Sequence, residues 1–265
     1  MSDRPPTSTH DATIVDQFSR QAAAFAQSAA LQNEEALDLL VSTGNPLPTN
    51  ATLDVACGPG SIAIAFAKRV RHATGLDATE AMLQEARRKA AQEQVRNVAW
   101  SRGSVYALPF PDGAFDIVSC RFAFHHLERP AQAFAEMIRV CASRGRIVLC
   151  DAVCSDDPRK AAAFNRMERF RDPSTVEFRS LGFLRALYLD ETRQSASSTS
   201  GSGGIKLPTR KLERRKPIWR RGWQRGALPS ARDALRARRW RSPSLRQGAG
   251  RRWPIWSPTS MPARR

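Results

Sequence analysis

The stretch Thr52-Leu-Asp-Val-Ala-Cys-Gly-Pro-Gly60 decides the fold. It is a short apolar strand that carries one acid, Asp54, and that runs into a tight glycine turn before a helical segment over 61–70. Gly58 and Gly60 let the backbone approach a ligand closely, because no Cβ stands in the way. A helix that opens after such a turn presents free N–H groups and a positive dipole end. The stretch therefore predicts a site for a small polar or anionic cofactor.

Strand patterns alternate with helix patterns on both sides of this stretch. Strands are expected over 51–56, 72–77, 95–100, 115–121 and 146–153. Helices are expected over 11–43, 61–70, 79–89, 129–141 and 155–188, with a turn at 143–145. The apolar run 147–149 is typical of a strand that is buried on both faces. This alternation predicts an α/β fold, in which a parallel sheet carries helices on both faces and binds ligands past the carboxyl ends of its strands.

The distribution of charge divides the chain. Its net charge is +17, and residues 191–265 account for all of it, with 20 Lys and Arg against three acids. We expect a mobile N-terminus over 1–10, a domain over 11–188 with its core at 51–153, and a basic, disordered tail over 189–265.

The glycine turn by itself leaves the cofactor open. Gly58, Gly60 and Ala63 fit the pattern GxGxxG/A, and Asp77 follows Gly58 by 19 residues, a spacing suited to a carboxylate that binds ribose hydroxyls. NAD and other adenosine cofactors satisfy this pattern equally. Asp54 inside the strand is unusual for NAD, however, and it favours a cationic ligand such as S-adenosylmethionine. The chain also lacks the Tyr/Lys or His arrangement of an NAD-dependent oxidoreductase.

Four motifs in order resemble one family. They are 53–60, Gly75-Leu-Asp-Ala-Thr-Glu-Ala-Met-Leu83, the segment 103–118, and Phe124-His-His-Leu127. They are similar to motifs of class I S-adenosylmethionine-dependent methyltransferases, in particular the type 11 domain of the ubiquinone/menaquinone-biosynthesis C-methyltransferase group. The segment 15–25 is similar to the N-terminal helices of that group, so the resemblance covers about 11–188. It implies a Rossmann-like fold and methyl transfer from S-adenosylmethionine to a small-molecule acceptor.

The resemblance also implies site residues. The methionine portion of the cofactor would lie against Asp54, Ala56, Cys57, Gly58 and Gly60, with backbone of Arg121 close by. The ribose hydroxyls would bind Asp77, next to Ala78, and the adenine would contact Met82, Ser104 and Val105. Two positions depart from the family pattern. Ala56 replaces its first glycine, and Ser104 replaces an acid that accepts from the adenine amino group, so we expect looser cofactor binding.

Catalytic residues are less evident. Methyl transfer from a sulfonium needs positioning above all, and a base only where the nucleophile loses a proton. His125 and His126 are the candidate bases, although the simpler interpretation is that they shape the loop after the fourth strand. Tyr106 could face the cofactor or cover the third strand. The Phe/Ala stripe over 14–25 is better explained by packing than by a substrate pocket, although the resemblance implies that it can be both. No cluster has metal-ligand spacing.

Two interpretations of the tail remain open. The family expects two more strands after residue 188, whereas residues 191–265 contain no Val, Phe, Tyr, Cys, His or Asn. An out-of-frame reading of a GC-rich gene produces such a composition, and it would leave a sheet without its last two strands and a catalytically impaired, cofactor-binding remnant. Alternatively, Arg-rich segments with interspersed Trp can bind nucleic acid.

Cysteine usage and hydropathy suggest a compartment. The five cysteines form no CxxC pair, which is typical of reduced thiols. No apolar segment of about 20 residues and no leader pattern is found, so we expect a cytoplasmic protein without a membrane span.

Overall fold

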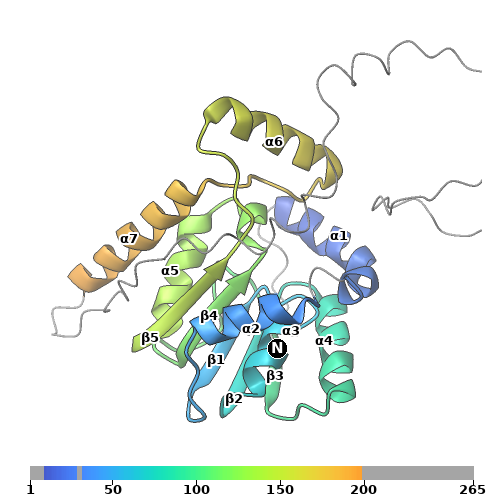
Figure 1. Cartoon of the computed structure of the whole chain (residues 1–265), viewed down its shortest axis with the longest axis vertical. Helices are drawn as coiled ribbons and strands as arrows, with labels where there is room; N and C mark the ends of the chain where they lie inside the picture. Colours follow the sequence, from blue (N-terminus) through green and yellow to red (C-terminus); the bar gives the residue numbers. More distant parts are fainter. Residues whose placement is uncertain (1–8, 29–31, 199–265) are drawn as a thin grey trace, which may run out of the picture. The chain divides into compact units, whose positions relative to one another are not determined.

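The computed structural model describes residues 9–28 and 32–198. The helices are α1 (Thr9–Ala26), α2 (Glu34–Thr43), α3 (Ser61–Ala67), α4 (Glu80–Gln92), α5 (Pro130–Val140), α6 (Pro158–Arg171) and α7 (Leu181–Ser198), with a 3-10 turn η1 (Phe124–His126). The strands are β1 (Ala51–Val55), β2 (His72–Asp77), β3 (Val98–Arg102), β4 (Phe115–Arg121) and β5 (Cys141–Cys150). Figure 1 shows how they are arranged.

The five strands form one parallel sheet in the order β3-β2-β1-β4-β5. This confirms the predicted α/β fold. Strand order reverses between β1 and β4, so the carboxyl ends of these two strands flank the position where such sheets bind ligands. Asp54 pairs in register with Gly75 of β2 and with Ser119 of β4, which places it in the middle of the sheet.

Helices cover both faces of the sheet (Figure 1). On one face, α2 and α3 bury Val41 and Phe66 against Ile117. On the other face, the core contains Phe134 and Met137 of α5, together with Leu187 of α7. Burying apolar side chains of this size contributes roughly 1.5–3 kcal/mol each. The two cores hold the strand ends, and therefore the site, in fixed positions.

The last strand differs from the sequence-based expectation. β5 begins at Cys141, and the expected turn at 143–145 lies inside it as an irregularity, where the partners shift from Phe115–Cys141 to Ile117–Arg146. The expectation that 147–149 is buried on both faces is confirmed only in part, since Ile147 and Leu149 pack half-buried against one core and Val148 packs against the other. Only Val148 is buried, at 8% exposure, because β5 is the edge of the described sheet.

The segment after β5 contains two helices instead of one continuous pattern. The predicted helical stretch 155–188 is interrupted at 172–180, between α6 and α7. After β5, the described residues contain no further strand of the sheet. They form one isolated β-bridge, between Cys154 and Ser180. α7 runs past the expected domain boundary at 188. The predictions for 1–8 and 199–265 lie outside the described residues. No helix in the described ranges has the length and apolarity that a membrane span requires.

Trp100 packs where β2 and β3 meet the glycine turn. A Cβ added to Gly75 would lie 2.5 Å from Trp100 Cζ3 and 2.8 Å from Cys57 Sγ. A Cβ added to Gly60 would lie 2.5 Å from Trp100 Cη2. The indole therefore fills the space that two glycines leave open, and it packs against the turn.

We predict that Gly75→Ala lowers the free energy of unfolding by about 1–3 kcal/mol, because the added methyl group displaces the indole. Urea denaturation measures the change. Gly182→Ala is the control, since a Cβ there meets no atom closer than 3.5 Å. Equal stability of the Gly75→Ala variant and the unchanged chain would contradict this packing role.

Candidate functional site

A cavity of about 1060 Å³ opens at the carboxyl ends of the strands. The strand ends and the loops that follow them form one wall, and apolar side chains of α1 form another. Ten of the eleven residues predicted to bind the cofactor line it: Asp54, Ala56, Cys57, Gly58, Asp77, Ala78, Met82, Ser104, Val105 and Arg121. Gly60 is not among the lining residues, because it faces Trp100. The tertiary structure thus brings residues from four strand ends into one space.

Asp54 is a buried carboxyl group at the end of β1. Its side chain is 3% exposed and accepts a hydrogen bond of 2.7 Å from the Ser119 hydroxyl. Burial raises the pKa of Asp54 from 3.8 to about 7, although the Ser119 hydrogen bond and the positive charge of Arg121 oppose the shift. A cation in the cavity would favour the ionised carboxylate.

Asp77 ties the end of β2 to the glycine turn. Its Oδ2 accepts from the Gly58 N–H at 2.8 Å, and its Oδ1 accepts from the Thr79 N–H at 2.9 Å. Burial raises the pKa of Asp77, while these backbone hydrogen bonds act in the opposite direction. Asp77 also lines the cavity, where its carboxylate is an acceptor for hydrogen bonds from a ligand.

The turn itself uses left-handed backbone. Ala56 has φ 54°, Gly58 has φ 51° and Gly60 has φ 80°. This conformation suits glycine and costs an alanine roughly 1 kcal/mol, which is the physical consequence of alanine at the first glycine position of the motif. Trp100, which sequence reasoning missed, also lines the cavity. Its only signal was a glycine in the neighbouring strand, and the register that pairs Gly75 with Trp100 is a tertiary property.

The loop after β3 places Ser104, Val105 and Tyr106 on the cavity wall. Ser104 Oγ accepts from the Tyr106 N–H at 3.2 Å. The Tyr106 hydroxyl accepts from the Glu128 N–H at 3.1 Å, and the Arg129 guanidinium lies 4.2 Å from the ring centroid. Tyr106 therefore lines the cavity and also joins this loop to the segment that follows η1.

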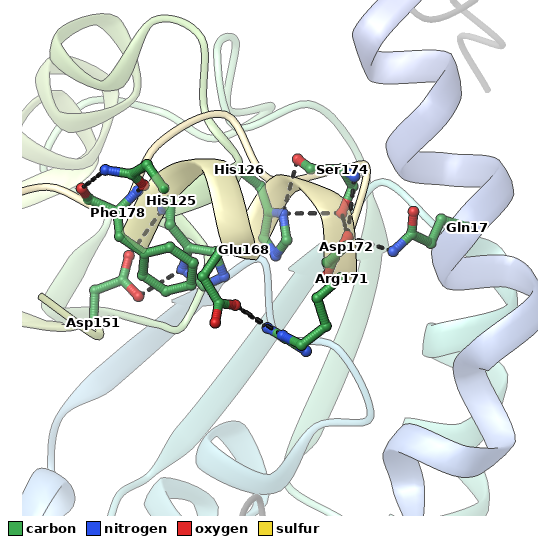
Figure 2. A network of polar contacts seen from close by, with 10 residues as sticks. Gln17, His125, His126, Asp151, Glu168, Arg171, Asp172, Ser174 and Phe178 are labelled. Carbon is green, nitrogen blue, oxygen red and sulfur yellow. Dashed lines mark hydrogen bonds and ion pairs between the residues drawn. The ribbon is translucent and has the colours of Figure 1, made fainter. Parts of the chain in front are cut away.

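The two histidines of η1 have different surroundings (Figure 2). The His125 ring donates from Nδ1 to Asp151 Oδ1 at 2.7 Å and stacks on Phe178 with a centroid distance of 4.2 Å. His125 does not line the cavity, whereas His126 does. Burial and the neighbouring His125 lower the pKa of His126 from 6.5 to about 4. The histidine pair predicted from the sequence therefore divides into one residue at the cavity and one behind it.

Helix α1 contributes more than packing. Ile14, Val15, Phe18 and Phe25 line the cavity, and none of them is fully buried. The stripe was interpreted from the sequence mainly as packing. The structure shows both roles that the resemblance allows, because Ala22 is buried, whereas Ile14, Phe18 and Phe25 line the cavity. A spacing of three and four predicts the face of a helix but not what that face covers.

No group of three or more potential metal ligands occurs within 9–28 and 32–198. The cavity lining contains four carboxyl groups, from Asp11, Asp54, Asp77 and Glu80, and four guanidinium groups, from Arg87, Arg102, Arg121 and Arg129. The two buried carboxyl groups among them, Asp54 and Asp77, suit a ligand that has hydroxyl groups and a positive charge.

Comparison with known proteins agrees with this geometry. Residues 53–149 match the family model described as a methyltransferase domain. The chain is 34% identical over 171 residues to the methyltransferase YcgJ of Bacillus subtilis, covering 64% of this chain and 68% of that protein. It is 38% identical over 109 residues to the ubiquinone/menaquinone biosynthesis C-methyltransferase UbiE of a Ruegeria species, covering 40% of this chain and 44% of that protein. The crystal structure of YcgJ superposes with a TM-score of 0.58 at 35% identity, covering 60% of this chain and 68% of YcgJ. The chain thus spans less than half the length of UbiE.

The raised pKa of Asp54 predicts how stability depends on pH. Between pH 3.8 and about 7, the folded chain keeps a proton on Asp54 that the unfolded chain has released. This contribution to stability is complete below pH 3.8 and is lost as the pH rises through 7. We expect Asp54→Asn to reduce the fall in unfolding free energy between pH 5 and pH 8 by about 2 kcal/mol, as measured by urea denaturation at both values.

Asp112→Asn is the matched control, because the Asp112 side chain is 82% exposed. The same pH slope in Asp54→Asn and in the unchanged chain would show that Asp54 is ionised in the folded protein throughout this range.

Proposed function

This chain belongs to the methyltransferase domain family, and from that premise we propose that it transfers a methyl group from S-adenosylmethionine to a small-molecule acceptor. One observation carries the proposal. Two buried carboxyl groups, Asp54 and Asp77, lie at neighbouring strand ends in a single cavity, with the glycine turn between them. A cofactor with a ribose and a cationic amino acid portion needs this pair of acceptors.

The proposed contacts follow the strand ends. Asp77 binds the ribose hydroxyls, with Ala78 beside it. The methionine portion lies along Ala56, Cys57 and Gly58, and Asp54 faces its positive charges. Met82, Ser104 and Val105 contact the adenine. Gly60 does not contact the cofactor in this arrangement. Its lack of a side chain leaves room for the indole of Trp100 to pack against the turn.

The chemistry requires little from the protein beyond placement. When bound, S-adenosylmethionine supplies an activated methyl group on a sulfonium. The chain's own residues orient the cofactor and the acceptor, a contribution that reaches several kcal/mol for well-aligned reactants. The cavity volume of about 1060 Å³ lies at the upper end of the usual range of ligand pockets, so it has room for a cofactor and a small acceptor together.

Apolar side chains supply the wall that remains for the acceptor. Phe18 and Ile14 of α1 and Phe122 after β4 also line the cavity. Phe122 is held at φ 55°, in a conformation that L residues rarely adopt. We infer that the acceptor has an apolar body.

Three expectations stay predictions. Impaired activity and nucleic-acid contact both concern the tail, and residues 199–265 lie outside the described ranges. Cytoplasmic location rests on cysteine usage and on the sequence pattern alone.

We predict that affinity for S-adenosylmethionine rises between pH 6 and pH 8, by up to about tenfold, as Asp54 ionises around its pKa of about 7. Isothermal titration calorimetry at the two pH values measures it, and Asp54→Asn should remove the dependence. NAD is the control ligand. Binding of NAD in place of S-adenosylmethionine would overturn the proposed function.

We predict that Ser104→Asp tightens cofactor binding about fivefold, since a carboxylate accepts the adenine amino hydrogen bond more strongly than a hydroxyl does. Calorimetry at pH 8 is the measurement. Ser104→Asn is the matched control, because it has the same shape without the charge. If affinity is unchanged in the Asp variant, Ser104 does not face the adenine.

A further inference from the structure

The hydrogen bonds of His126 fix where its proton sits. His126 Nδ1 lies 3.0 Å from the Ser174 carbonyl oxygen and 3.1 Å from Ser174 Oγ. A carbonyl oxygen can only accept, so Nδ1 carries the hydrogen. In the neutral ring the lone pair is therefore on Nε2. That nitrogen makes no hydrogen bond within the described ranges, although the residue is only 7% exposed and lines the cavity.

A chain of polar contacts holds this arrangement (Figure 2). Ser174 Oγ donates to Asp172 Oδ1 at 2.6 Å, because a carboxylate can only accept. The same carboxylate oxygen accepts from the Gln17 amide of α1. The Phe18 ring meets the His126 ring edge-on at a centroid distance of 5.1 Å. His126 is thus oriented from two sides, by the loop between α6 and α7 and by α1.

Burial keeps the His126 ring neutral. Burial and His125 lower its pKa, while Asp172 and Asp151 act in the opposite direction and the Ser174 hydrogen bond also raises it. With a pKa of about 4, the ring is free of the second proton throughout the range from pH 5 to pH 8. His125 differs, since Asp151 accepts from both its ring and its backbone N–H, at 2.7 and 2.9 Å.

We propose that His126 Nε2 is the base that removes a proton from the methyl acceptor, and that Ser174 and Asp172 are the positioning residues that fix its tautomer. The inference rests on the proposed methyl transfer. The acceptor atom forms a bond to the methyl carbon, the carbon–sulfur bond breaks, and its electron pair stays on sulfur. The proton of the acceptor passes to Nε2 and then to solvent.

This arrangement selects a class of acceptor. A base is needed only where the attacking atom carries a proton that methylation makes acidic, as a hydroxyl oxygen does when it gains the methyl group. A weak base is sufficient there, because the methylated hydroxyl is a strong acid. The structure therefore favours a hydroxyl-bearing acceptor over a nucleophile that carries no proton.

The tautomer is testable without an acceptor. Long-range ¹H–¹⁵N NMR of the full chain should show His126 with Nδ1 protonated and Nε2 bare at pH 7, and still bare at pH 5.5. Ser174→Ala removes the hydroxyl but not the carbonyl, and it should shift part of the population to the Nε2–H form. An Nε2–H tautomer or a doubly protonated ring at pH 7 in the unchanged chain would overturn the proposal.

The catalytic role is tested with two nucleophiles, 4-nitrocatechol, whose hydroxyl loses a proton, and iodide, which has none. His126→Gln should lower kcat for 4-nitrocatechol at least about 100-fold and change iodide methylation less than about threefold. Ser174→Ala should lower kcat for 4-nitrocatechol about tenfold with KM unchanged. His72→Gln is the matched control, because it makes the same replacement at the amino end of β2, whereas the cavity lies at the carboxyl ends of the strands.

The outcomes separate the two proposals. Equal losses with both nucleophiles would assign His126 a packing role, and no loss with 4-nitrocatechol would exclude it as the base. Binding of S-adenosylmethionine by the unchanged chain without transfer to 4-nitrocatechol would also overturn the inference. Failure to bind S-adenosylmethionine in calorimetry would overturn the proposed function itself, and the NMR result on the tautomer would stand apart from it.

Discussion

The hydrogen bond from the Gly58 N–H to the Asp77 carboxylate is the contact on which the site depends. It joins the end of β2 to the turn after β1 at 2.8 Å, across two strands that are already paired in parallel. The turn needs left-handed backbone at three positions, which is unfavourable for an alanine. Asp77 binds the Gly58 N–H, and the indole of Trp100 packs against Gly60, and both contacts hold the turn in that shape. These two contacts therefore determine the shape of the part of the cavity that the turn lines.

Burial of carboxyl groups gives the cavity its chemical preference. Asp54 is removed from water, and the hydrogen bonds from Ser119 and the Ala63 backbone, with the charge of Arg121, offset this burial only in part. A ligand with positive charge compensates it. His126 shows the converse effect, because burial disfavours its charged form and leaves a neutral ring with a free lone pair. Burial thus makes Asp54 favour a nearby cation, and it leaves His126 neutral and able to accept a proton.

The site joins segments that lie far apart in the chain. Gln17 of α1 donates to Asp172 and the Phe18 ring meets the His126 ring, so His126 is held by segments that lie more than 100 residues apart in the chain. The helix periodicity of 14–25 predicted a helix, and the loop at 172–174 had no signal at all in the sequence. Their meeting is decided by packing on the sheet. Sequence reasoning therefore found the cofactor wall but missed the polar chain that orients His126.

The sequence by itself determined the alternation of strands and helices, the glycine turn and the acids at the ends of β1 and β2. These features are local, since periodicity, turn chemistry and strand ends are each written in a few neighbouring residues. Only the tertiary structure decided that Gly60 packs against Trp100 instead of lining the cavity. It also decided that His126 lines the cavity, while His125 binds Asp151. Each of these depends on strand register or on contacts between distant segments. Such contacts form only when the chain has packed, because the burial that defines them does not exist in any segment alone.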